Sequence, residues 1–224
     1  MKYIAVKLDI VKSRHLPMQA GELGRLPLRA NVQEMLFHAV NEANIVFSDS
    51  LASQFIVTLG DEVQGLLKAE ASAVLFKIVE YFSDQMRPVR LRFGIGFGAL
   101  STPLREVSVG MDGPAWHRAR EAVENAGDLV SFRGFGEQND EILGSLASLL
   151  LVLVRRWSRR QRDFVSMTRE GLTQVQIATQ ARLTQSAVSQ RLLSAEWRTY
   201  NRGVTALSGL IAACTADSGQ SVEK

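Results

Sequence analysis

The segment from Thr173 to Leu192 constrains the fold most, because it joins two short helical patterns through a tight four-residue connection. In the first pattern, the adjacent Ile177 and Ala178 lie on the side expected to be buried. In the second, Val188 and Leu192 are spaced i, i+4, as on the inner face of a helix. The pattern predicts two helices packed against each other across a turn.

The outward side of the second helix carries side chains that donate or accept hydrogen bonds. With the capping residue that precedes them, they are Thr184, Gln185, Ser186, Ser189, Gln190 and Arg191. Side chains of this kind can contact base edges and phosphates in a major groove. The segment resembles the helix-turn-helix of bacterial transcription regulators, which implies double-stranded DNA as a partner. A helical hairpin that does not contact DNA is the alternative.

The turn departs from the usual pattern at one position. Bacterial regulators commonly place glycine where the backbone needs a positive φ, and this chain has Arg182 there. A residue other than glycine in that conformation costs about 1 kcal/mol, which a packed domain can absorb. Upstream, Thr173 and Gln176 have the spacing of a capping box, which predicts the start of the first helix.

The charge is unevenly distributed along the chain. From Glu141 onward there are 11 lysines and arginines against 6 acidic residues, whereas the first 140 residues hold 15 against 17. This asymmetry indicates a polyanionic partner for the C-terminal part. Arg155, Arg159 and Arg162 are spaced to share one helical face, where Arg155 and Arg159 are expected to hold DNA phosphates. A solvated helix surface is the alternative.

Length and composition set the broad class. The 224 residues suffice for one or two domains, and a single cysteine, Cys214, excludes an internal disulfide framework. A reducing, cytoplasmic location is therefore expected, and the short apolar start, interrupted by Lys2 and Lys7, does not resemble a signal peptide. No membrane partner is expected, because the longest apolar run, residues 142–154, is too short to cross a bilayer.

The first 135 residues alternate between strand and helix patterns. A Gly60-Asp61 pair between two apolar runs predicts a two-residue hairpin, and Pro114 suits the first turn of a helix. The strands are expected at 3–10, 54–59, 62–67, 89–99 and 128–135, with a possible short strand at 107–109, and the helices at 29–42, 69–85 and 114–125.

This order of elements predicts an α+β fold with a ferredoxin-like, or palm, sheet. The polar segment 136–140 breaks both patterns and is expected to separate two domains. The expected division is a palm domain over residues 1–138 and an all-helical domain over 139–224, with the helix-turn-helix at about 173–192.

An ordered series of short motifs runs through the front half. The series reads DIVKSR at 9–14, TLGDE at 58–62, RFGIG at 92–96, GMDG at 110–113 and AR at 119–120. It resembles the catalytic domain of class III nucleotide cyclases and, more distantly, diguanylate cyclases. The DIVKSR opening is closer still to the bacterial SatD-like family. The resemblance covers residues 2–135.

Two aspartates of this series are candidate metal ligands. In a ferredoxin-like sheet the first strand is central and the hairpin pairs beside it, so Asp9 and Asp61 would face one hollow. Carboxylates with nearby carbonyls form an oxygen site for Mg²⁺ or Mn²⁺. The resemblance implies Asp9 and Asp61 as ligands, with help from the Ile10 carbonyl. The alternative is that Asp9 ends a strand and Asp61 makes a turn.

The same resemblance implies a nucleotide site beside the metal. The loop after Asp9 would present Lys12, Ser13 and Arg14 to phosphates, next to Gly60 of the hairpin. Arg120 matches the arginine that stabilises transition-state charge in cyclases.

Two further positions depart from the cyclase pattern. Val57 replaces the lysine that contacts the base, and Trp116 replaces an asparagine. Losing a preorganised group of this kind costs a reaction several kcal/mol, so binding is favoured over turnover.

The favoured hypothesis is a DNA-binding transcriptional regulator. Its cyclase-like domain would bind a metal-nucleotide or serve as a dimerisation scaffold, and a homodimer is expected because such regulators read paired half-sites. The alternative is an active metal-dependent nucleotidyl cyclase or phosphotransfer enzyme, so whether the chain is an enzyme stays open.

Overall fold

The computed structural model describes residues 1–11, 28–58, 60–125, 127 and 129–217. Lys12, Ser13 and Arg14 lie outside the described residues. The chain forms two compact units, and the division passes through two helices. We call residues 1–148 with 207–224 the sheet unit, and residues 149–206 the helical unit. The domain boundary expected near residue 138 stays a prediction.

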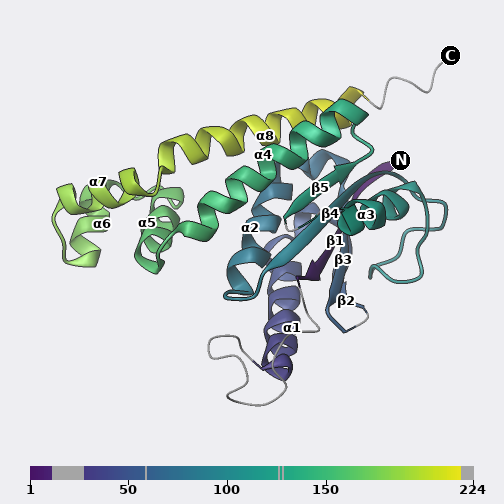
Figure 1. The fold of residues 1–224 in the computed structure, drawn as a ribbon, viewed down its shortest axis with the longest axis horizontal. Helices are drawn as coiled ribbons and strands as arrows, with labels where there is room; N and C mark the ends of the chain where they lie inside the picture. Colours follow the sequence, from purple (N-terminus) through teal and green to yellow (C-terminus); the bar gives the residue numbers. More distant parts are fainter. Residues whose placement is uncertain (12–27, 59, 126, 128, 218–224) are drawn as a thin grey trace. The chain divides into compact units, whose positions relative to one another are not determined.

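The sheet unit is built on five strands in the order β2-β3-β1-β4-β5 (Figure 1). The strands are β1 (Lys2–Ile10), β2 (Leu51–Val57), β3 (Glu62–Lys68), β4 (Leu91–Ala99) and β5 (Val130–Arg133). Strand β1 is central and antiparallel to both β3 and β4, β2 is antiparallel to β3, and β5 is parallel to β4.

The connections confirm the predicted α+β, ferredoxin-like sheet. Helix α1 (Arg29–Val46) links β1 to β2, and α2 (Leu75–Gln85) links β3 to β4. These are two interleaved split βαβ units. Two short 3-10 helices complete the path, η2 (Ser48–Ser50) and η3 (Ala69–Val74), so the predicted helix 69–85 begins as a 3-10 helix.

One face of the sheet packs against α2. Phe55 of β2 lies over Gly65 of β3, where a Cβ atom would come within 2.2 Å of its ring. The same ring meets Phe82 of α2 edge to face, with centroids 5.3 Å apart. Val6 of β1, which pairs with Gly65, is fully buried, so this face forms the main core.

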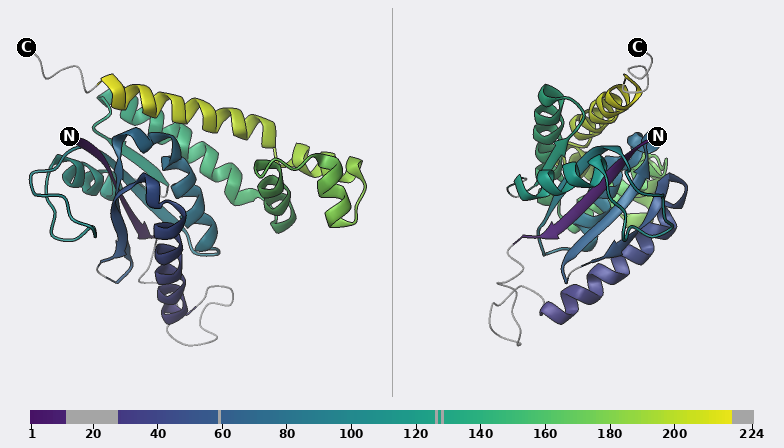
Figure 2. Two further views of the ribbon diagram at one scale, coloured as in Figure 1. Left: turned by 180° about the vertical axis from the view of Figure 1, so that it is seen from behind. Right: turned by 90° about the vertical axis from the view of Figure 1, so that its right-hand side faces the viewer.

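Helix α3 (Pro114–Asn125) lies on the opposite face of the sheet (Figure 2). Gly94 and Gly96 of β4 leave bare backbone there. A Cβ at Gly96 would lie 2.2 Å from the Ala115 carbonyl oxygen, and one at Gly94 would lie 2.3 Å from that of Ala119. The alternating glycines of β4 therefore let α3 lie directly on the strand.

The remaining helices are α4 (Glu137–Arg156), α5 (Arg159–Arg169), α6 (Gln174–Ala181), α7 (Gln185–Ser194) and α8 (Trp197–Asp217). Helices α4 and α5 are separate because Ser158 forms a capping box with Gln161 and starts a new helix. Arg155 lies in the last turn of α4, whereas Arg159 is the first residue of α5. The predicted arginine stripe on one helical face is therefore wrong.

Two other local predictions differ from the structure. The polar segment at 136–140 is not a break, because α4 begins at Glu137 and the Asp140 carboxylate accepts hydrogen bonds from the backbone N–H groups of Gly134 and Phe135. The hairpin connection, residues 58–61, is longer than two residues, since β2 ends at Val57. Among the described residues, no helix is long and apolar enough to cross a membrane.

Candidate functional site

The structure brings Asp9 and Asp61 to the same end of the sheet. Asp9 is the register partner of Glu62 on β3, and Asp61 precedes Glu62 in the hairpin. Facing Cα atoms in an antiparallel pair are about 4.5–5.5 Å apart, and one residue adds about 3.8 Å. The Cα atoms of Asp9 and Asp61 are therefore within roughly 10 Å of each other.

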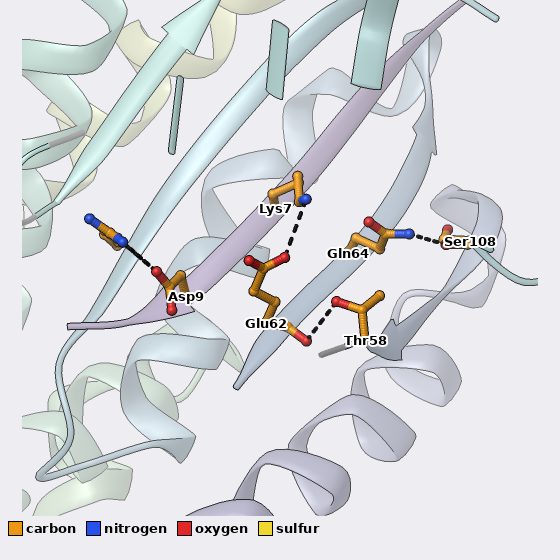
Figure 3. Close-up of polar contacts among 7 residues, drawn as sticks. Lys7, Asp9, Thr58, Glu62, Gln64 and Ser108 are labelled. Carbon is orange, nitrogen blue, oxygen red and sulfur yellow. Dashed lines mark hydrogen bonds and ion pairs between the residues drawn. The ribbon is translucent and has the colours of Figure 1, made fainter. Parts of the chain in front are cut away.

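Asp9 is engaged by an arginine of the neighbouring strand (Figure 3). Arg92 faces Asp9 in the register of β1 and β4, and its Nε and Nη2 atoms donate to Asp9 Oδ2 at 3.0 and 2.5 Å. The Asp9 side chain is 18% exposed. Such a charge-assisted, two-donor contact fixes the carboxylate against the sheet.

A second ion pair lies one row away on the same face. Lys7 Nζ is 3.4 Å from Glu62 Oε2, and only 9% of the Lys7 side chain is exposed. Gln64 faces Lys7 across the strands and donates from Nε2 to the Ser108 carbonyl. Figure 3 shows these contacts side by side. We call Lys7, Asp9, Glu62 and Arg92 the ion-pair ladder.

As it stands, this donor set does not fit a divalent ion. Among the described residues, no three or more histidine, cysteine, aspartate or glutamate side chains are grouped so that they could hold a metal. The Asp9 carboxylate is already paired with a guanidinium, which donates twice to its Oδ2 atom. Mg²⁺ or Mn²⁺ at Asp9, Ile10 and Asp61 stays a prediction from the resemblance.

The candidate nucleotide residues are only partly placed. Gly60 has φ +71°, and no atom lies within 4 Å of the position that a Cβ would take, so the glycine serves the backbone of the turn. Arg120 is exposed on α3, and its side chain makes no hydrogen bond or ion pair with any residue the structure describes. Ile10 is buried at the end of β1.

The two departures from the cyclase pattern lie in the sheet unit, Val57 on β2 and Trp116 on α3. Trp116 is 8% exposed and packs on Ala5 and Leu66, which makes it a core residue of the α3 face. Val57 ends β2 opposite Val63. Val57 has no hydrogen-bonding side-chain atom, and the buried Trp116 Nε1 has no hydrogen-bond partner among the described residues.

The helical unit contains the predicted helix pair with the predicted turn. Arg182 follows α6 in the left-handed conformation, with φ 52° and ψ 49°. The Thr173–Gln176 capping box is formed at the start of α6, and Thr184 Oγ1 accepts a hydrogen bond from Ala187 N at the start of α7.

Helices α5, α6 and α7 lie together in the helical unit (Figure 1), and a small apolar core joins them. It is formed by Phe164, Val165, Ile177, Ala178, Val188 and Leu192, all buried. Trp157 Nε1 donates to the Ala195 carbonyl oxygen at 2.8 Å, and Gln161 Nε2 donates to Ser194 Oγ at 3.1 Å. These bonds tie the end of α7 to the start of α5.

The outward residues of α7 lie as the sequence predicted. Gln185, Ser186 and Gln190 are exposed, together with the capping Thr184, and Ser189 is partly exposed. Arg191 differs, because its guanidinium lies 5.9 Å from the centre of the Phe164 ring and donates to the Ala187 carbonyl at 3.3 Å. It therefore helps to pack α7 against α5.

The helical unit is strongly positive, whereas the rest of the chain is negative. It contains ten arginines and three acidic residues, a formal charge of +7, while the rest of the chain carries −4. Arg159 is exposed on α5 and Arg155 is partly exposed. A unit of this size and charge attracts polyanions.

Comparison with known families places the chain. The model of the SatD family matches residues 3–211, which includes the sheet, the ion-pair ladder and the helix pair. The chain belongs to the SatD family. In this SatD protein the match confirms the family suggested by the DIVKSR opening. No curated protein matches the chain.

Sequence reasoning missed three residues of these sites, namely Lys7, Arg92 and Gln174. Gln174 Oε1 accepts a 2.6 Å hydrogen bond from Gln185 Nε2. Strand alternation could have placed Lys7 on the face of Asp9. Arg92 required the register of β4 against β1, which no local pattern supplies.

Proposed function

We propose that this SatD family member is a DNA-binding transcriptional regulator that reads duplex DNA with α7. One observation supports this above all others: a packed helix pair presents uncharged hydrogen-bonding side chains from a unit of charge +7. Amides and hydroxyls suit base edges, whereas arginines nearby suit phosphates.

Different residues would supply the sequence specificity and the affinity for DNA. Gln185 and Gln190 lie exposed on α7, where a glutamine amide can pair with the N6 and N7 atoms of adenine. Arg155 lies on α4 and Arg159 on α5, outside the α6–α7 pair, and both would contact phosphates. A homodimer would place two copies of α7 in major grooves about one helical turn apart.

Fluorescence anisotropy with duplex DNA tests this proposal. The full chain should bind duplex in preference to single-stranded DNA of equal length, with an affinity that falls steeply as salt rises. Gln190→Ala should weaken binding to a preferred sequence by about 5- to 100-fold and leave random-sequence binding unchanged. Equal losses on both sequences would contradict base reading by α7.

The sheet unit would have one of two roles. It would bind a nucleotide with its metal near Asp9 and Asp61, or it would pair two copies of the chain as a scaffold. The ion pairs on Asp9 and Glu62 favour the scaffold, since both carboxylates already have a cation. Light scattering should then give a dimer, and nucleoside triphosphates with Mn²⁺ should leave the melting temperature unchanged.

A nucleotidyl cyclase or phosphotransfer enzyme is the second candidate. The placement of Asp9 and Asp61 at one end of the sheet favours it. The packing of Trp116 in the core and the contact of Arg92 with Asp9 speak against it. Incubation with Mn²⁺ and each nucleoside triphosphate, followed by mass spectrometry, decides: a cyclic or dinucleotide product that Asp61→Ala abolishes would establish the enzyme.

A further inference from the structure

Three strands bring one charged residue each into a single row of the sheet. Asp9 of β1 is flanked by Glu62 of β3 and Arg92 of β4, all in register. The next row places Lys7 within 3.4 Å of Glu62. Each acidic residue of the ladder is thus matched by a basic residue that the sheet itself supplies.

The contact between Arg92 and Asp9 is fixed by the pairing of β1 with β4. Two nitrogen atoms of one guanidinium converge on a single carboxylate oxygen, and about two thirds of the Arg92 side chain is covered. Facing positions on neighbouring strands hold both side chains on the same face, so little freedom is lost on pairing. Partial burial also limits screening by water and salt.

A guanidinium in this position disfavours a second cation. A divalent ion on Asp9 would stand beside a fixed positive charge that already neutralises the carboxylate, and like-charge repulsion would weaken its binding. A carboxylate left there without any cation would also be unfavourable, because it is mostly buried.

We infer that Arg92 is the built-in cation of this site: it neutralises Asp9 in the place where the resemblance to cyclases implies a divalent ion. The sheet unit therefore folds without metal. The inference concerns the sheet unit alone and stands or falls independently of DNA binding by α7.

Thermal unfolding of the full chain in EDTA and in rising Mn²⁺ tests the inference. The wild type should melt at the same temperature in both. Arg92→Gln should melt lower in EDTA and should gain about 3 to 5 °C at a Mn²⁺ concentration ten times its dissociation constant. Adding Asp9→Asn to that variant should abolish the gain, since Asp9 would be the ligand.

Arg133→Gln is the matched control. Arg133 lies on β5 of the same sheet and pairs with Glu121 of α3 at 2.9 Å, and its side chain is about as exposed as that of Arg92. It should show no response to Mn²⁺. A wild-type shift as large as that of Arg92→Gln, or no shift in Arg92→Gln, would overturn the inference. If Arg92→Gln does not fold, the wild type can be tested alone by adding it to Mn²⁺ and recording the electron paramagnetic resonance signal of the free ion. The inference requires that this signal does not fall when the protein is added.

Discussion

Gln185 at the start of α7 donates a 2.6 Å hydrogen bond from its side-chain amide to the side-chain carbonyl of Gln174 at the start of α6. The bond uses one N–H of the Gln185 amide and fixes the plane of that amide. Its carbonyl oxygen and second N–H stay available for a base edge. Gln174 would thereby orient a DNA-reading residue without reading a base itself.

Gln174→Ala should reduce preference at one base position. The expected loss is about 5-fold in affinity for the preferred sequence, because Gln185 would then rotate freely before binding. Affinity for random duplex should not change. Gln180→Ala is the control, since Gln180 is exposed on the same helix. Equal effects of the two substitutions in competition binding would show that the hydrogen bond has no role in reading.

Arg159→Ala should act on affinity alone. An arginine that neutralises one phosphate releases about one counterion, so its removal should lower the slope of log K against log salt by about one. The loss should be the same for preferred and random duplexes. A loss confined to the preferred sequence would mean that Arg159 contacts a base.

Arg182→Gly should stabilise the helical unit. Arg182 adopts φ 52°, a conformation that glycine takes without steric cost, so the free energy of unfolding should rise by about 1 kcal/mol in urea denaturation. Arg182→Ala removes the same side chain and keeps the Cβ, and it should bring no such gain. Similar stabilities for the two variants would place the effect in charge rather than in the backbone.

Gly96→Ala should destabilise the sheet unit by about 3 kcal/mol. Its Cβ would lie 2.2 Å from the Ala115 carbonyl oxygen and 2.3 Å from Ala119 N, so α3 would have to move off the sheet. Gly209→Ala is the control within α8, where no atom lies within 4 Å of the added Cβ, and it should stabilise by about 0.5–1 kcal/mol. A neutral Gly96→Ala would mean that α3 is not seated on β4.

Much of the fold could be predicted because its signals are local. Pro114 marks the first residue of α3 and the Thr173–Gln176 pair marks the start of α6, both where the structure has them. The left-handed turn at Arg182 followed from its position between two helical patterns. The break before α5 also had a readable signal, a capping box at Ser158 and Gln161.

The candidate sites were less predictable, because their contacts join distant parts of the chain. Asp9 and Arg92 are 83 residues apart and meet only because β1 and β4 pair in one particular register. A shift of that register by one residue would move Arg92 to the other face. The sequence could place acidic residues at one end of the sheet, but only the pairing showed which cation neutralises them.

The most direct test of the account is selection of the full chain on a random pool of duplex DNA, followed by sequencing of the bound fraction. The account predicts a short enriched motif for the wild type that both Gln185→Ala and Gln190→Ala weaken, while Gln180→Ala leaves it intact. Enrichment of no motif, or the same motif for all four proteins, would contradict the proposal that α7 reads DNA.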